Sequence, residues 1–292
     1  MPLNAKEIRR RIKGVASTRQ ITKAMEMVAA AKVRRALGRA TSARPYSQGI
    51  KDMFATVTSF VPAGELSSKL LERREVKKVA IIVVTSDKGL AGAFNSNVIR
   101  AAVNRVREWK AQGAEPHLLI VGTKGVTFFR HSNFPVISRY TNLPAIPTFA
   151  EASVIAEEVT KLYAEGTVDK VELVYTQFHS MLRYTPEVTD LLPASLPESA
   201  GTATSQREYL FEPSAEAMVE ELIPKYLETV VYQALLESAS SFFASQMNAM
   251  SNASKNAGEM IQHLTLVLNK ARQGAITQEI LEVVGGAEAL KA

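Results

Sequence analysis

The sequence predicts an α/β fold: a domain with a largely parallel sheet, inserted between two long terminal helices that pair as an antiparallel coiled coil. Three observations predict it. Apolar residues recur at helical spacing over about the first 58 residues, strand and helix patterns alternate from Lys78, and a seven-residue apolar repeat occupies much of the last third.

The N-terminal helix is predicted to begin at Asn4, which forms a capping-box pattern with Glu7. Large apolar residues lie on related faces of this helix: Ile8, Ile12, Val15, Ile21, Met25 and Val28. Pro45 has no amide hydrogen and should kink or break the helix, which then resumes to about residue 58. The stretch ITKAMEMVAAAKVRR (21–35) has too few polar residues for a solvated face and too many small ones for an ordinary core.

The middle of the chain alternates strands and helices, which predicts a parallel sheet. VAIIVVTS (79–86) is a continuous β-branched run, typical of a strand buried on both faces. Further strands are predicted at 117–122, 135–140 and 170–180, and helices at 96–113 and 149–166. Segments 183–192 and 206–212 are predicted to be edge strands on either side of the loop PASLPESAGTATS.

The last third is predicted to be one helix with a coiled-coil seam, because its apolar and small residues follow alternating steps of four and three. The seam consists of Phe243, Met247, Met250, Ser254, Ala257, Ile261, Leu264, Leu268, Ala271 and Ala275. Ser214 is expected to cap this helix, Pro224 to kink an early turn and Gly285-Gly286 to stop it.

The lengths of the two helices predict how they are arranged. At 1.5 Å per residue they span on the order of 80 and 105 Å, whereas a domain of about 150 residues is roughly 40 Å across. We therefore expect most of the helical pair to extend beyond the α/β domain. The end of the second helix carries apolar residues that this chain cannot bury, so they predict an interface with another protein or a dimer contact. These residues are Ile276, Ile280, Leu281, Val283, Val284 and Leu290.

The charge is unevenly distributed. The net charge is +6, but residues 1–44 alone contain twelve Lys or Arg against only Glu7 and Glu26. A basic helix of this kind is a solvated face or meets an acidic protein surface or nucleic acid. No aromatic residue for base stacking precedes Tyr46, which disfavours single-stranded nucleic acid. There is no cysteine, and no run approaches the roughly 20 apolar residues of a membrane span.

Three motifs, in this order, carry a family resemblance: ITKAMEMVAAAKVRRA, TSDKGLAGAFN and LVLNKARQGAITQEILEVVGGAEAL. Together they resemble the γ subunits of F-type ATP synthases over essentially the whole chain. The resemblance implies a coiled-coil helix (1–58), a Rossmann-like foot domain (76–212) and a second coiled-coil helix (213–292). It also implies a central shaft that turns inside three α and three β subunits and contacts an ε subunit and the membrane c-ring, without catalysing a reaction itself.

The resemblance also implies partner-binding residues. Met25 is expected to face a β subunit that carries an acidic loop. Arg272, Gln273, Thr277, Gln278 and Glu279 match the motif that contacts the β catch loops, and Tyr209 and Glu212 match the foot segment that meets the c-ring. On residue chemistry alone, Met25 would be a seam methionine and the polar residues ordinary helix surface.

The residues do not indicate an enzyme. SDKGLAGAF lies between a strand and a helix, but it is neither G-x-G-x-x-G nor G-x-x-x-x-G-K-[ST], so a tight βα turn is the favoured interpretation. The four histidines (His117, His131, His179 and His263) lack metal-ligand spacing. We therefore expect no catalytic residue, metal or cofactor, and no nucleic-acid partner. The alternative function is a non-enzymatic coiled-coil adaptor that binds acidic partners or nucleic acid through the basic helix.

The start of the chain shows neither an export signal nor a transit peptide. With the resemblance, this leads us to expect a peripheral protein on the cytoplasmic face of a bacterial inner membrane. The absence of cysteine argues against the thiol-regulated chloroplast form.

Overall fold

A computed structural model describes residues 5–60, 68–194, 212 and 214–289. The chain has two compact units, one made of Met1–Ala29 with Met247–Ala292 and the other of Ala30–Gln246. The helices α1 (Ala5–Phe60) and α5 (Ala215–Ala289) each contribute to both units. The predicted capping residue Asn4, the loop segment 195–205 and most of the predicted strand 206–212 lie outside the described residues, and Glu212 itself is in a bend.

The larger unit contains a five-stranded sheet in the order β3-β2-β1-β4-β5. Its strands are β1 (Lys78–Val84), β2 (Glu115–Val121), β3 (Val136–Tyr140), β4 (Lys170–Phe178) and β5 (Tyr184–Leu192). The first four are parallel, and β5 pairs antiparallel with β4 at the edge. The predicted parallel sheet and the edge strand at 183–192 are therefore confirmed.

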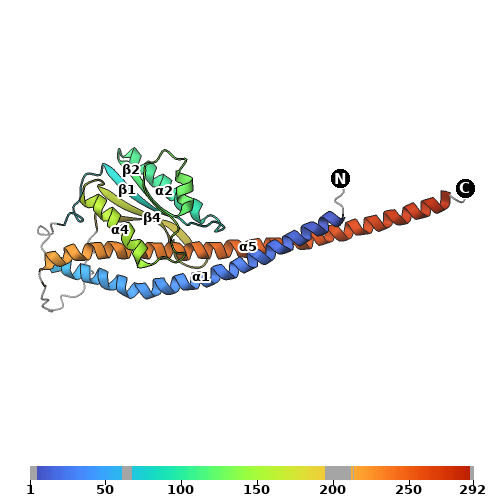
Figure 1. Cartoon of the computed structure of the whole chain (residues 1–292), viewed down its shortest axis with the longest axis horizontal. Coiled ribbons are helices and arrows are strands. Elements are labelled where there is room, and N and C mark those ends of the chain that lie inside the picture. Colours follow the sequence, from blue (N-terminus) through green and yellow to red (C-terminus); the bar gives the residue numbers. More distant parts are fainter. Residues whose placement is uncertain (1–4, 61–67, 195–211, 213, 290–292) are drawn as a thin grey trace. The chain divides into compact units, whose positions relative to one another are not determined.

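Helices cover both faces of this sheet (Figure 1). On one face, α2 (Phe94–Ala111) and α3 (Thr123–Phe129) pack on Val79, Ile81 and Val83 of β1. On the other, α4 (Phe149–Ala164), α5 and the end of α1 pack on the alternate residues of the same strand. The period-two pattern of β1 explains this arrangement, because successive side chains point to opposite faces. The helix α3 was not predicted from the sequence.

Gly122 is the point where β2 turns into α3. Its φ is +93°, and a Cβ at this position would lie 2.4 Å from the carbonyl oxygen of Thr85. The Thr85 hydroxyl donates to the Val121 carbonyl at 2.7 Å and accepts from the Gly125 amide at 2.9 Å. Only glycine fits this turn, since both the backbone angle and the space exclude a side chain.

The two long helices pair antiparallel within each unit. In the larger unit, Phe54 of α1 stacks on Tyr226 of α5 and the Lys32 ammonium lies over the Phe243 ring. In the smaller unit, Ala16 and Ile261 line the same pocket as Glu26 and Ser251. Rising numbers on α1 thus match falling numbers on α5, so the predicted antiparallel pairing is confirmed.

Both long helices continue through their prolines. α1 is one helix through Pro45, as predicted for the N-terminal segment, and α5 continues through Pro224, although each proline removes a backbone hydrogen bond. Packing of Ile50, Phe54 and Val57 in the core beyond Pro45 accounts for the continuity of α1. Gly285-Gly286 does not stop α5, because each helical glycine costs only about 1 kcal/mol relative to alanine. The expected cap is confirmed, since the Ala217 amide donates to the Ser214 hydroxyl at 3.2 Å.

Candidate functional site

The N-terminal part of α1 buries small residues and exposes large ones. Ile21 and Val28 are 58% and 55% exposed, whereas Thr22 and Ala29 are buried. Of the large apolar residues predicted to lie on related faces of this helix, Ile8 is thus buried, whereas Ile21 and Val28 are exposed. Small side chains allow two helix backbones to approach closely, so Thr22 and Ala29 take the inner positions. An exposed apolar face remains, which is typical of an interface.

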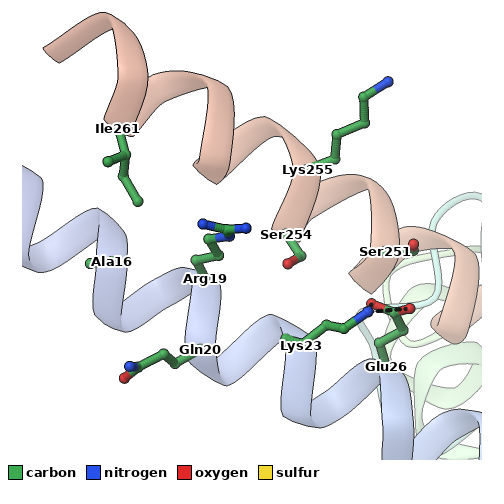
Figure 2. A pocket seen from close by; sticks show the side chains of 9 residues that line it. All are labelled: Ala16, Arg19, Gln20, Lys23, Glu26, Ser251, Ser254, Lys255 and Ile261. Atoms are coloured by element: carbon green, nitrogen blue, oxygen red, sulfur yellow. Dashed lines mark hydrogen bonds and ion pairs between the residues drawn. The ribbon is translucent and has the colours of Figure 1, made fainter. Parts of the chain in front are cut away.

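Met25 is half-buried in the smaller unit, and the next residue, Glu26, lines a polar pocket of about 540 Å³ (Figure 2). The pocket is lined by Ala16, Arg19, Gln20, Lys23, Glu26, Ser251, Ser254, Lys255 and Ile261. The Lys23 ammonium pairs with the Glu26 carboxylate at 3.1 Å. The Arg19 side chain crosses to α5, where its guanidinium lies 3.6 Å from the position of a Cβ on Gly258. With three cations and one carboxylate, the pocket is suited to an acidic partner surface.

The C-terminal part of α5 is exposed along its whole length from Arg272 to Ala287. The predicted residues Arg272, Gln273, Thr277, Gln278 and Glu279 all lie here. The Thr277 hydroxyl donates to the Gln273 carbonyl at 2.9 Å, and the Gln278 amide donates to Glu282 at 2.9 Å. These hydrogen bonds stay within the helix, so Arg272 and Glu279 remain open to a partner.

The same segment exposes large apolar side chains. Ile276, Ile280, Leu281, Val283 and Val284 are between 46% and 72% exposed. The prediction that this chain leaves them uncovered is confirmed, while Leu290 lies outside the described residues. The seam that precedes them is also confirmed as far as Ala271, because its members are buried or half-buried while Ala275 is exposed.

Met25 and the Arg272–Glu279 segment do not form one site. Figure 2 shows Ala16 opposite Ile261 and Glu26 opposite Ser251, which places Met25 level with about residue 252. Arg272 is then about 30 Å further along α5. The structure thus separates the two regions that were predicted to bind partners. Glu212 is exposed, and Tyr209 lies outside the described residues, so their predicted role stays a prediction.

The loop after β1 is a tight turn, as predicted. Asp87 accepts hydrogen bonds from the Thr123 amide and hydroxyl at 2.8 and 2.6 Å. Burial raises the pKa of Asp87, but these bonds outweigh it and leave the pKa below its ordinary value. Leu90 and Gly92 adopt φ of +63° and +52°. Phe94, Phe242 and Phe243 pack together beside the loop, in the apolar cluster that includes Ala91.

Two further kinds of site were sought in the described part of the chain, a metal-binding cluster and a membrane-spanning helix. Among these residues, no group of three or more His, Asp or Glu side chains could hold a metal ion. No helix in the same ranges is long and apolar enough to cross a membrane. The residues that sequence reasoning missed are the small inner ones, Thr22 and Ala29, and the pocket cations Arg19 and Lys255. Heptad spacing of Thr22, Ala29 and Ala36 was the available signal.

Comparison with known proteins supplies the family. The family model described as ATP synthase matches residues 4–290. An ATP synthase gamma chain from Pelotomaculum thermopropionicum is 49% identical over 286 residues, which cover 98% of this chain and 99% of the relative. Another from Brevibacillus brevis is 44% identical over 291 residues, or 99% of each chain.

Solved structures agree in fold. A chain of the Tetrahymena thermophila mitochondrial ATP synthase central stalk and c-ring is 28% identical, with a TM-score of 0.60 over 80% of this chain and 99% of that chain. A chain of the Euglena gracilis mitochondrial ATP synthase has a TM-score of 0.65 at 19% identity over 98% and 94% of the two chains, a likeness of fold alone.

Proposed function

Because this chain belongs to the ATP synthase gamma-chain family, we propose that it is the central rotor shaft of an F-type ATP synthase. Rotation of a membrane c-ring, driven by protons, turns the shaft, and the shaft takes the three catalytic β subunits through their conformational cycle. The single observation that carries this proposal is the exposed C-terminal part of α5, with its large apolar side chains. Such a surface needs a surrounding protein partner.

Each part of the chain has a role in this proposal. Residues 1–58 and 213–292 form the coiled coil inside the ring of three α and three β subunits, and residues 76–212 form the foot domain that meets the ε subunit and the c-ring. The similar Tetrahymena chain comes from a structure of a central stalk with its c-ring, which supports this assignment. The foot contact with the c-ring is assigned to Tyr209 and Glu212.

The two regions on the helix pair have different partners. Met25 and the basic pocket beside it face an acidic loop of a β subunit, since Arg19, Lys23 and Lys255 supply positive charge there. Arg272, Gln273, Thr277, Gln278 and Glu279 contact the β catch loops. These polar side chains can exchange partners as the shaft turns, whereas the neighbouring apolar residues guide it.

The chain is a non-catalytic subunit of the complex, held peripherally on the cytoplasmic face of a bacterial inner membrane. The tight turn after β1 supports the first statement, because Phe94, Phe242 and Phe243 pack beside the loop that a phosphate would need. The purified chain alone is therefore expected to hydrolyse no ATP. Hydrolysis by it that is lost on changing Gly89 or Asn95 would contradict this.

The function is tested by coexpression with α and β subunits and two variants. Truncation before Ile280 removes apolar contacts that are worth at most roughly 1.5 to 3 kcal/mol per side chain, and a rotating contact realises less. Complex yield should fall while some rotation survives. The double variant Arg272→Ala with Gln273→Ala should lower ATP turnover more than complex yield.

The measurements are complex yield, ATP turnover and torque in single complexes. The wild-type chain should copurify as one copy with three α and three β subunits. The proposal gives the apolar residues a guiding role and the polar residues a role in transmitting torque. This division is wrong if truncated complexes assemble but produce no torque while the double variant hydrolyses ATP at the normal rate. Failure of the wild-type chain to copurify with these subunits would refute the proposed function itself.

A further inference from the structure

Three buried serines of α5 join this helix to the α/β domain of the larger unit. The Ser238 hydroxyl accepts from the Thr176 amide at 3.1 Å, and the Ser241 hydroxyl donates to the Thr176 carbonyl at 3.3 Å. The Ser245 hydroxyl donates to the Ala91 carbonyl at 2.6 Å. The three serines are spaced by three and four residues, so they lie on one face of α5.

The Thr176 amide and carbonyl need these partners because β4 extends beyond the end of its neighbour β1. The ladder between β1 and β4 ends at the pair Val83 and Val174, while β4 continues to Phe178. On its other side, Thr176 is opposite Pro186 of β5, and the Thr176 amide and carbonyl point away from that strand, toward α5. Ser238 and Ser241 therefore supply the acceptor and the donor that a further stretch of β1 would have supplied.

The Ser245 contact reaches a different element. Ala91 lies in the tight turn after β1, between Leu90 and Gly92, which both have positive φ. The Gly92 backbone brings the turn close to Ser245, whose oxygen is 3.6 Å from the position of a Cβ on Gly92. One helix face is thus bonded both to the end of β4 and to the turn after β1.

These hydrogen bonds fix the rotation of α5 about its axis, which the surrounding apolar packing cannot do. Phe242, Phe243 and Ala244 are buried beside the serines, but apolar contact is non-directional and tolerates small rotations of a helix. Hydrogen bonds weaken steeply when their angles change, and an unpaired buried backbone group is costly. Ser240 provides an internal contrast, because it is equally buried but donates at 2.8 Å to Leu236 of its own helix.

We propose that Ser238, Ser241 and Ser245 form a torque-bearing clamp, which holds α5 at one rotational setting and one register on the α/β domain. The torque-bearing role rests on the proposed rotor function. Force that a partner applies to α5 passes into the α/β domain through these hydrogen bonds as well as through the apolar packing of α5 on the sheet. Without the clamp, α5 can rotate or shift along the apolar surface of the α/β domain. The number of protons pumped per ATP hydrolysed then falls.

The test compares the triple variant Ser238→Ala/Ser241→Ala/Ser245→Ala with the matched control Ser240→Ala. The first readout is hydrogen exchange of the full-length chain over residues 171–178 and 236–246. Exchange should accelerate about tenfold in the triple variant, since each lost bond of this kind shifts a local opening equilibrium several-fold. The control should exchange like the wild type.

The second readout is the ratio of protons pumped to ATP hydrolysed, measured in membrane vesicles with assembled complexes. This ratio should fall at least about twofold in the triple variant and stay unchanged in the control, whereas a merely structural role would lower yield and not the ratio. If the triple variant does not fold, Ser241→Ala alone, which leaves the Thr176 carbonyl unpaired, should show the same two effects at smaller size.

Each outcome has a distinct meaning. Unchanged exchange would show that the serines do not hold the helix, and faster exchange with an unchanged ratio would show a clamp that carries no torque; both overturn the proposal. Equal effects of the control would assign the change to lost helix stability. If the wild-type chain supports no pumping, the rotor function fails and the torque-bearing role with it, whereas exchange still decides whether the serines hold α5.

Discussion

At the scale of single residues, Glu172 is the most buried charge of the described chain, with 0% of its side chain exposed. Its carboxylate accepts from Arg105 Nε and Nη2 at 2.7 and 2.6 Å and from Trp109 Nε1 at 3.0 Å. Burial raises the pKa of Glu172, but the hydrogen bonds from Arg105 and Trp109 outweigh it and lower the pKa below its ordinary value of 4.5.

Glu172→Ala is expected to destabilise the chain by on the order of 3 to 5 kcal/mol, because it leaves Arg105 and Lys170 together without their buried counter-charge. Glu108→Ala is the control, since this exposed carboxylate also pairs with Arg105 but should contribute about 0 to 1 kcal/mol. Urea unfolding of the full-length chain measures both. Equal shifts of the urea midpoint in the two variants would show that the burial of Glu172 does not increase its contribution to stability.

The lowered pKa gives this contribution a direction in pH. A carboxyl with a lower pKa in the folded state stabilises the fold above its unfolded pKa and loses that contribution as pH falls through the folded value. The stability difference between wild type and Glu172→Gln should therefore be largest near neutral pH and shrink below about pH 4.

At the scale of elements, the pairing of α1 with α5 depends on small side chains. Ala29 is fully buried in the smaller unit, whereas Ala24, five residues earlier on the same helix, is exposed. Ala29→Leu should destabilise the helix pair by roughly 1 to 3 kcal/mol, because a well-packed position has no room for three more carbons. Ala24→Leu should change stability by less than about 0.5 kcal/mol.

Thermal unfolding followed by circular dichroism compares the two alanine variants in the full-length chain. A loss of stability in Ala24→Leu as large as that in Ala29→Leu would mean that the inner face of α1 is assigned wrongly. An unfolding temperature of Ala29→Leu equal to that of the wild type would mean that α1 and α5 can separate around residue 29.

At the scale of the whole molecule, α1 and α5 each run through both compact units without a break. A substitution in one part of a helix can therefore affect the coupling of the whole complex. Met25→Lys adds a fourth cation beside Arg19, Lys23 and Lys255. Under the proposed function, it should strengthen the contact with an acidic loop and lower the number of protons pumped per ATP hydrolysed. Met27→Lys adds the same charge on another face and should have a smaller effect.

Proton pumping and ATP hydrolysis in membrane vesicles measure this prediction. An unchanged ratio for Met25→Lys in complexes of normal yield would count against an acidic partner at this position. Equal effects of both variants would point to added charge in general and not to the place of Met25.

Local structure followed from the sequence by itself. The β-branched run of β1, the alternation around it and the seven-residue repeat of α5 are periodic signals, and periodicity reports which side chains share a face. The elements of the sheet, the edge strand β5 and the exposed apolar end of α5 were therefore predictable. Three motifs were enough to indicate the family.

Tertiary structure decided which of the possible faces is buried. Ile21 and Val28 fit a helical period as well as Thr22 and Ala29 do, and only the close approach of α5 selects the small pair. The helical spacing of Ser238 and Ser241 does not indicate their hydrogen-bond partners, because these bonds form only where β4 extends beyond β1. The glycines at 285 and 286 mark an end in sequence but not in space, since a local cost of about 1 kcal/mol each does not end a 75-residue helix.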